Sequence, residues 1–176
     1  MATVILTDEH GRLRGTADRR AAHSGAGLLH KAFSVYVFRR GGKELLVQQR
    51  SGAKPLWPLV WANSCCSHLR EGEELAAGAE RRLREELGFS CSLREVGAFV
   101  YRAADPHGRG VEHEHDSLFV GEVADDIEVR PDAGEVAAWR WVGVEAVQRE
   151  MAERPDEFAP WFHLGLPKVL AALERG

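Results

Sequence analysis

Short apolar runs, each followed by a turn-forming stretch, mark the first fifty residues of the chain. The run TVIL at residues 3–6 and the segment LRG at 13–15 flank a turn at Asp8 to Gly11. The run AFSVYVF at 32–38 and the run LLVQQR at 45–50 flank the segment RRGGKE. Apolar runs separated by glycine-bearing turns are typical of β-hairpins. The pattern therefore predicts two hairpins.

The segment after residue 73 has a helical period instead. Leucine or alanine recurs every four residues at positions 75, 79, 83 and 87, and a glycine follows at position 88. Apolar residues at this spacing lie on one side of an α-helix, and glycine commonly ends a helix. The pattern predicts a helix over residues 74–87 that Gly88 closes.

The second half of the chain continues the alternation of strands and helices. Strands are expected in SLREVGAFVYRA at 92–103, DSLFVGEV at 116–123 and VAAWRWV at 136–142, and the remainder, from residue 143, is expected to be helical. Strands interrupted by two or three helices are typical of a mixed sheet covered on both faces. We therefore predict an α/β fold, a mixed β-sheet between α-helices, as a single domain over residues 1–176.

Composition limits the classes of function. The chain has 176 residues, of which 44% are hydrophobic and 28% charged, and its formal net charge is -4. A mildly acidic chain has no general attraction for nucleic acid or for an anionic membrane, so neither is expected as a partner. The amino-terminal apolar run of four residues is too short for a signal peptide or a spanning helix. We expect a cytoplasmic protein, and a monomer is favoured.

The stretch WANSCCSHL at residues 61–69 contains two of the three cysteines of the chain. A disulfide between neighbouring residues is strained, so Cys65 and Cys66 are expected to be free thiols, which a reducing cytoplasm permits. In an extended segment the two side chains would point to opposite faces. One thiol would then be available for chemistry while the other packs.

Histidines recur at positions that suit a metal site. Two of them, His23 and His30, lie seven residues apart across a glycine-rich segment, and His68 follows the cysteines. Neutral imidazole and carboxylate oxygen are common ligands of zinc, manganese and iron. Three other histidines are expected to be solvated: His10, His107 and His163.

The segment VEHEHD offers further ligands. If it is a strand, Glu112 and Glu114 lie on one face, and His113 and His115 lie on the other. The sequence predicts that this segment contributes to a divalent-cation site, but it leaves open which face does so.

The helix at 74–87 carries the most specific local motif. Glu73, seven further residues and then RRLREELGF resemble the signature of the Nudix superfamily, with Ser67 in place of its first glycine and Arg82 in place of one glutamate. An arginine lowers the negative charge available to a cluster of several metal ions. The alternative is that Arg82 and Glu86 form an exposed i, i+4 ion pair on an ordinary surface helix.

Five blocks in order extend the resemblance over nearly the whole chain. They are AAHSGAGLLHKAFSVYVF, KPLWPLVWANSCCSH, RRLREELG, YRAADPHGRGVEHEH and FAPWF, and they resemble the type I isopentenyl diphosphate isomerases, a branch of the Nudix superfamily. The resemblance implies the Nudix fold and a metal-dependent enzyme of isoprenoid biosynthesis. Such an enzyme interconverts isopentenyl and dimethylallyl diphosphate, which are small homoallylic and allylic diphosphates.

The resemblance also implies roles for individual residues. A first metal ion, Mn²⁺, Zn²⁺ or Mg²⁺, would be held by His23, His30, His68, Glu112 and Glu114. The catalytic thiol would be Cys66, which is also counted with the metal site, and Glu86 would help bind a Mg²⁺ ion on the substrate diphosphate. The basic residues near that diphosphate would be Arg19, Arg50, Lys54 and Arg82, with Arg19 in place of a lysine.

The implied reaction needs an acid and a base on opposite sides of an alkene. Glu114, with Tyr101, would serve on the metal side and Cys66 on the other, and the sequence does not decide which of them protonates first. The Trp161 ring would face the carbocation, an interaction of about 2 kcal/mol when desolvated. The alternative for Trp161 is that APWF only fills the core.

Two other classes of function stay open. One is a Nudix hydrolase acting on nucleoside or sugar diphosphates, which would not need Cys66 next to His68. The other is a metal-binding or regulatory module without catalysis on a degenerate Nudix fold.

Overall fold

Strand β3 (His30–Arg39) is the centre of the fold in the computed structural model, which describes residues 2–175. Strand β8 (Val111–Glu122) runs parallel to β3 along one edge, from the pair His30 and Glu114 to the pair Phe38 and Glu122. On the other edge β3 pairs in turn with β1 (Thr3–Thr7), β6 (Cys65–His68) and β4 (Glu44–Arg50). The near-continuous apolar sequence of β3 fits a strand that is buried on both faces.

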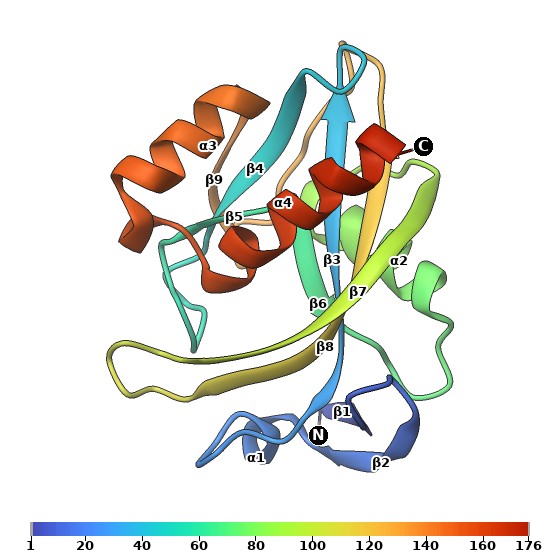
Figure 1. Cartoon of the computed structure of the whole chain (residues 1–176), viewed down its shortest axis with the longest axis vertical. Helices are drawn as coiled ribbons and strands as arrows, with labels where there is room; N and C mark the ends of the chain where they lie inside the picture. The colour runs from blue at the N-terminus through green and yellow to red at the C-terminus, as the bar shows by residue number, and fades with distance from the viewer. Residues whose placement is uncertain (1, 176) are drawn as a thin grey trace.

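The remaining strands extend this mixed sheet (Figure 1). Strand β2 (Leu13–Asp18) forms a hairpin with β1, and β7 (Leu93–Ala104) pairs with β8. Strand β4 turns away from β3 after two residue pairs and pairs with β9 (Val136–Gly143) and β5 (Trp61–Ala62).

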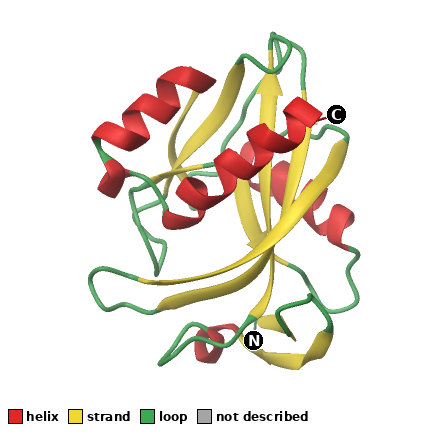
Figure 2. Cartoon of the chain, viewed as in Figure 1, coloured by secondary structure: helices red, strands yellow, loops and turns green. Residues whose placement is uncertain are grey.

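Helices cover both faces of the sheet (Figure 2). Helix α2 (Leu75–Leu87) packs on one face, and α3 (Val144–Glu153) and α4 (Pro160–Arg175) pack on the other. Two short helical segments, α1 (Arg19–Ala22) and η1 (Pro155–Glu157), lie in connections. The predicted α/β fold, a mixed sheet between helices, is confirmed.

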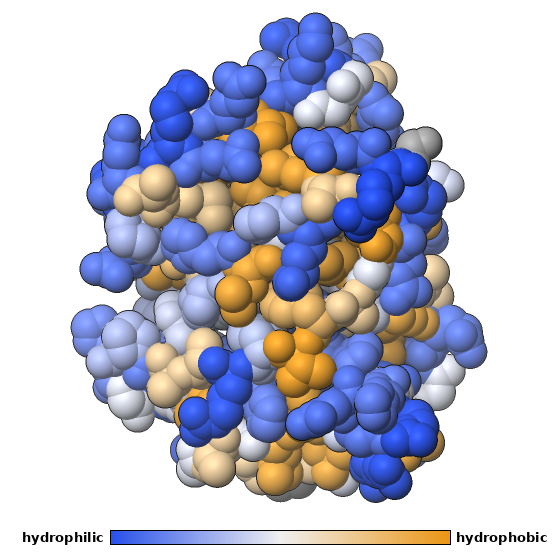
Figure 3. Space-filling model, viewed as in Figure 1, coloured by the Kyte–Doolittle hydropathy of each residue, from blue (hydrophilic) through white to orange (hydrophobic). Residues whose placement is uncertain are grey.

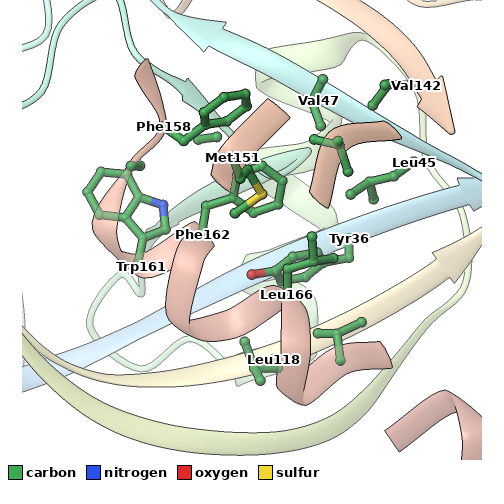
Figure 4. Packing of buried hydrophobic residues seen from close by; sticks show 14 of the residues in the cluster. Tyr36, Leu45, Val47, Leu118, Val142, Met151, Phe158, Trp161, Phe162 and Leu166 are labelled. Atoms are coloured by element: carbon green, nitrogen blue, oxygen red, sulfur yellow. The ribbon is translucent and has the colours of Figure 1, made fainter. Parts of the chain in front are cut away.

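Two apolar cores result from the alternation of side chains along β3. Tyr36 and Phe38 belong to the core under α3 and α4, and Figure 4 shows Tyr36 beside Leu166 and Phe162 of α4. Their neighbours on β3 belong to the core under α2. Burying one large apolar side chain contributes about 1.5–3 kcal/mol, so the two cores fix the position of β3 firmly.

Most of the elements predicted from the sequence are present. Both hairpins and the three later strands are found, and the helix spans Leu75–Leu87. Gly88 ends it with a left-handed φ of 77°, and a Cβ there would lie 2.6 Å from the carbonyl oxygen of Arg130. Three elements were not predicted, namely α1, β5 and β6, because segments of two to four residues depend on tertiary contacts more than on their own sequence pattern.

The face of the molecule in Figure 3 is mostly polar, and groups of apolar side chains lie along the middle of the view from top to bottom. Val100 of β7 and Leu164 of α4 are exposed apolar residues. Within residues 2–175, no helix has the length and apolar character needed to span a membrane.

Candidate active site

Three adjacent strands present the candidate site on one face. His30 of β3 lies beside Glu114 of β8, and Cys66 of β6 lies beside Ser34 of β3. Side chains of directly paired residues share a face, and the same face of β3 carries Tyr36 and Phe38 further along. The core under α4 therefore continues into a polar site at one end of these strands.

Five potential metal ligands converge there. His23, His30, His68, Glu112 and Glu114 each offer one ligand atom, and these atoms lie within 4.8 Å of one another. His23 Nδ1 lies 2.6 Å from the carbonyl oxygen of Arg19, and His30 Nδ1 lies 2.7 Å from that of Leu28. Because a carbonyl only accepts, these Nδ1 atoms carry hydrogen, which leaves the Nε2 lone pairs free in the neutral rings.

The Nε2 and carboxylate oxygen atoms of this group lie close enough together to share a cation. His23 Nε2 lies 3.0 Å from Glu112 Oε2, and His30 Nε2 lies 3.1 Å from His68 Nε2. Glu112 Oε2 is buried without a hydrogen-bond partner in the part of the chain that the structure describes. Lone pairs that face one another at these distances fit a divalent cation, and imidazole with carboxylate is a donor set for zinc, manganese or iron.

Burial shapes the charge states of this group. Burial and the neighbouring Glu114 raise the pKa of Glu112 to about 6. Burial also acts to raise the pKa of Glu114, but the Nε2 atoms of His30 and His68, which lie 3.6 Å and 2.8 Å from its Oε1, outweigh this and hold the pKa well below its usual range. Burial lowers the pKa of His68 to about 4, so this imidazole is neutral near pH 7, as a metal ligand must be.

The structure also decides between the two faces of VEHEHD. The side chains of Glu112 and Glu114 point into the site, whereas His113 Nδ1 lies 3.1 Å from the carbonyl oxygen of Gly27. The ring of His115 packs against the turn at Gly11. The carboxylate face of β8 therefore belongs to the five-ligand group.

The candidate acid and base groups share the same cleft. The Tyr101 hydroxyl donates to Glu114 Oε2 at 2.6 Å, and Cys66, Tyr101, Glu114 and Trp161 all line the cleft. Burial raises the pKa of the Cys66 thiol to about 12 despite the opposing effect of Arg50, whose Nη1 lies 4.0 Å from the sulfur. This raised pKa favours the protonated thiol at neutral pH.

Cys65 is separated from this chemistry. Its side chain is fully buried in the core under α2, on the face opposite to Cys66. The alternation of the two thiols expected from an extended segment is present.

The cleft has a volume of about 820 Å³ and a basic wall. The four basic residues named from the sequence all line it, namely Arg19, Arg50, Lys54 and Arg82. The sequence did not single out three further charged residues that line it: Arg20, Arg109 and Glu135. Arg20 follows Arg19 directly and Arg109 lies inside the block YRAADPHGRGVEHEH, so both had a signal in the sequence, whereas Glu135 lies outside all five blocks.

Arg50 has structural contacts besides its place in the cleft. Its Nε and Nη2 donate to the carbonyl oxygens of Trp57 and Leu56, both at 2.9 Å, and its guanidinium carbon lies 5.1 Å from the centre of the Trp161 ring. Trp161 in turn meets the Trp57 ring edge to face at 5.6 Å. Trp161 thus belongs both to the core and to the wall of the cleft.

Glu86 lies apart from the five-ligand group. It is 2% exposed, and its oxygens accept hydrogen bonds from Gln48 at 2.9 Å and from Arg82. The Arg82 and Glu86 pair therefore joins a partly buried guanidinium to a buried carboxylate and is not an ordinary surface pair. Among residues 2–175 the metal-ligand group includes neither Glu86 nor Cys66, so their roles as ligands stay predictions.

Known proteins with similar sequences and folds were found. The NUDIX domain model matches residues 28–162. The chain is 46% identical to an isopentenyl-diphosphate Delta-isomerase of Nocardia farcinica, over 90% of this chain and 89% of that protein. It is 44% identical to the protein of the same name from Burkholderia multivorans, over 91% and 88% of the two chains.

Solved structures agree on the fold. A Deinococcus radiodurans protein matches with a TM-score of 0.66 at 18% identity, covering 87% of this chain and 90% of that one. A C. elegans Ap4A hydrolase matches with a TM-score of 0.59 at 22% identity, covering 83% and 98%.

The chain belongs to the NUDIX domain family and, within it, to the family of isopentenyl-diphosphate Delta-isomerases. The family resemblance predicted from the sequence is confirmed.

Proposed function

We propose that the chain interconverts isopentenyl diphosphate and dimethylallyl diphosphate. The observation that carries this proposal is that Cys66 lines the same cleft as the Tyr101 and Glu114 pair, next to the five-ligand group and the basic wall. A hydrolase needs no thiol at this place. Relatives that are 38–46% identical to this chain are named isopentenyl-diphosphate Delta-isomerases, and the similarity covers most of both chains.

The two proton transfers would use both groups. One proton is added to the terminal alkene carbon, which gives a tertiary carbocation, and a different proton is then removed from the carbon on the other side of the cation. Cys66 and Glu114, assisted by Tyr101, serve as the two exchanging groups. The reaction is reversible, so each group acts as acid in one direction and as base in the other.

The rest of the cleft would hold the substrate and the cation. Trp161 offers an aromatic face to the developing positive charge. Arg19, Arg50, Lys54 and Arg82 bind the diphosphate through charge-assisted hydrogen bonds. A divalent ion in the five-ligand group, Mn²⁺, Zn²⁺ or Mg²⁺, would fix the Glu114 carboxylate, and a Mg²⁺ ion near Glu86 would neutralise part of the diphosphate charge.

One incubation separates the proposal from the other two classes. The purified protein is mixed with isopentenyl diphosphate and Mg²⁺, and the products are followed by proton and phosphorus NMR. Dimethylallyl diphosphate without free phosphate is the expected result. Release of phosphate would instead indicate a hydrolase, and metal uptake without any turnover would indicate a binding module. A cytoplasmic location, a monomeric state and the lack of nucleic-acid or membrane partners stay predictions.

A further inference from the structure

Glu135 is the carboxylate in the basic wall of the cleft that the proposed reaction does not use. It lies directly before β9, and its side chain is 30% exposed. Its backbone is fixed, because its carbonyl oxygen accepts from Ser51 N at 2.9 Å and its own N–H donates to Asp132 at 3.0 Å. The side chain therefore reaches into the cleft from a rigid support.

This carboxylate joins two cations that come from different elements. Lys54, in the loop after β4, donates to Glu135 Oε2, and Arg82 Nη2 of α2 lies 3.3 Å from the same oxygen. Burial acts to raise the pKa of Glu135, but the two cations outweigh burial and lower it. One anionic oxygen thus lies between the two cations.

We propose that Glu135 is a placeholder for the substrate: in the empty cleft its carboxylate occupies the place between Lys54 and Arg82 that a diphosphate oxygen takes on binding. This inference rests on the proposed function, which assigns these two cations to the diphosphate. Carboxylate and phosphate oxygens suit the same donors, because both are anionic acceptors. The two anions cannot share the place, since like charges repel there.

The sign of one substitution separates this role from simple support. If Glu135 competes with the diphosphate, Glu135→Gln removes the competing charge and keeps the shape, so an anionic ligand binds more tightly. If Glu135 instead only holds Lys54 and Arg82 in place, the same change loosens both cations and the ligand binds more weakly. The backbone hydrogen bonds of residue 135 do not depend on its side chain, so the variant keeps the loop.

Glu150 provides a matched control. It also joins two cations, since its carboxylate contacts Arg140 and lies 3.2 Å from Arg154 Nη2. It belongs to α3 and does not line the cleft. Glu150→Gln therefore removes the same kind of bridge at a place where no diphosphate is expected.

The test is calorimetric binding of inorganic pyrophosphate to the full chain at low ionic strength, without Mg²⁺. Pyrophosphate has no alkene, so the measurement does not depend on isomerisation. We expect Glu135→Gln to bind it about tenfold more tightly than the unchanged protein, and Glu150→Gln to bind it equally well. The gain should shrink in 0.5 M salt because exposed charges are screened.

Unchanged or weaker binding by Glu135→Gln would overturn the placeholder role. The NMR assay of the same samples keeps the two proposals distinguishable. Tighter pyrophosphate binding with no turnover of isopentenyl diphosphate by the unchanged protein would leave the placeholder standing and reject the isomerase. Failure of all three proteins to bind pyrophosphate would reject both the placeholder and the basic wall as a diphosphate site.

Discussion

The two ends of the cleft differ in the charged groups that line them. At the metal end, three imidazoles and two carboxylates point inward, and their ligand atoms lie within 4.8 Å of one another. At the basic end, Lys54 and Arg82 already contact carboxylates, which belong to Glu86 and Glu135. The first end gathers donor atoms for a cation, whereas the second end contains its own pairs of opposite charge.

This difference indicates how each end responds to its ligand. The ligand atoms at the metal end are electron-pair donors that a divalent cation would bind together, so this end is expected to depend strongly on its ion. The basic end is balanced when empty, so a diphosphate must displace an internal partner there. The thiol and the Tyr101 and Glu114 pair lie in the same cleft as both ends.

The largest effect is expected at the cysteine pair beside the metal end. Cys66→Ala should fold and keep its metal but lose isomerisation by about 10³-fold or more, because it removes one of the two proton-exchanging groups. Turnover is measured by NMR and metal content by elemental analysis. Cys65→Ala is the matched control: it should retain turnover and lose about 1 kcal/mol of stability, as expected for a small buried group.

An electrophilic substrate analogue gives an independent check on the same pair. An epoxide of the diphosphate should modify Cys66, which lines the cleft, and leave the buried Cys65 intact. Mass spectrometry of the peptide containing WANSCCSH locates the adduct. An active Cys66→Ala enzyme, or an adduct on Cys65, would contradict the assigned role of the thiol.

A smaller effect is expected from removing one metal ligand. His23→Ala should weaken binding of the divalent ion at least about 100-fold and reduce activity in step, because the remaining four ligands no longer enclose the ion. The control is His113→Ala, which changes a histidine next to Glu112 but on the other face of β8. Metal titration is compared for the two variants, and equal affinities would mean that the five-ligand group is not the metal site.

The sequence predicted the strands and the helix that carry the site better than it predicted which of their faces points into it. The sequence predicted β3 and α2 because their burial leaves clear patterns. A strand buried on both faces has a nearly continuous apolar run, and a helix buried on one side has apolar residues at a helical period. The two faces of β8 could not be distinguished in this way. Leu118 belongs to one core and Phe119 to the other, so hydropathy marks neither face as the inner one.

Some residues of the site could be predicted from the sequence and others could not. The family resemblance supplied the histidines, the thiol and four basic residues, and all of these except Arg19 and Arg50 lie inside the ordered blocks. No motif pointed to Glu135, whose contact with Lys54 spans 81 residues. The four-residue α1, which carries Arg19 and is followed directly by His23, depends on a cap by Asp18 and is too short for a periodic pattern.

The smallest effect is expected at the support of the basic end. The Asp105 carboxylate, in the turn after β7, accepts from Trp57 N at 3.0 Å, His107 N at 2.9 Å and Arg109 Nε at 2.9 Å. Trp57 has a left-handed φ of 45°, which is unfavourable for a residue with a side chain, so its loop needs such anchors. Lys54 lies in that same loop, so Asp105 supports the basic end from a distance.

Asp105→Asn should therefore raise the KM for isopentenyl diphosphate about threefold to fivefold, leave kcat nearly unchanged and cost about 1–2 kcal/mol of stability at pH 7.

Burial acts to raise the pKa of Asp105, but its three hydrogen bonds outweigh burial and lower the pKa to about 2. Because the folded pKa lies below the unfolded value of about 3.9, this stability is fully present above that value and is lost as the pH falls toward 2. Urea unfolding should thus show a smaller gap between the two proteins at pH 3 than at pH 7. The control is Asp8→Asn in the β1–β2 turn, which also removes an acceptor of backbone and arginine hydrogen bonds but should leave KM unchanged. An equal rise in KM for both variants would refute the link between Asp105 and the basic end.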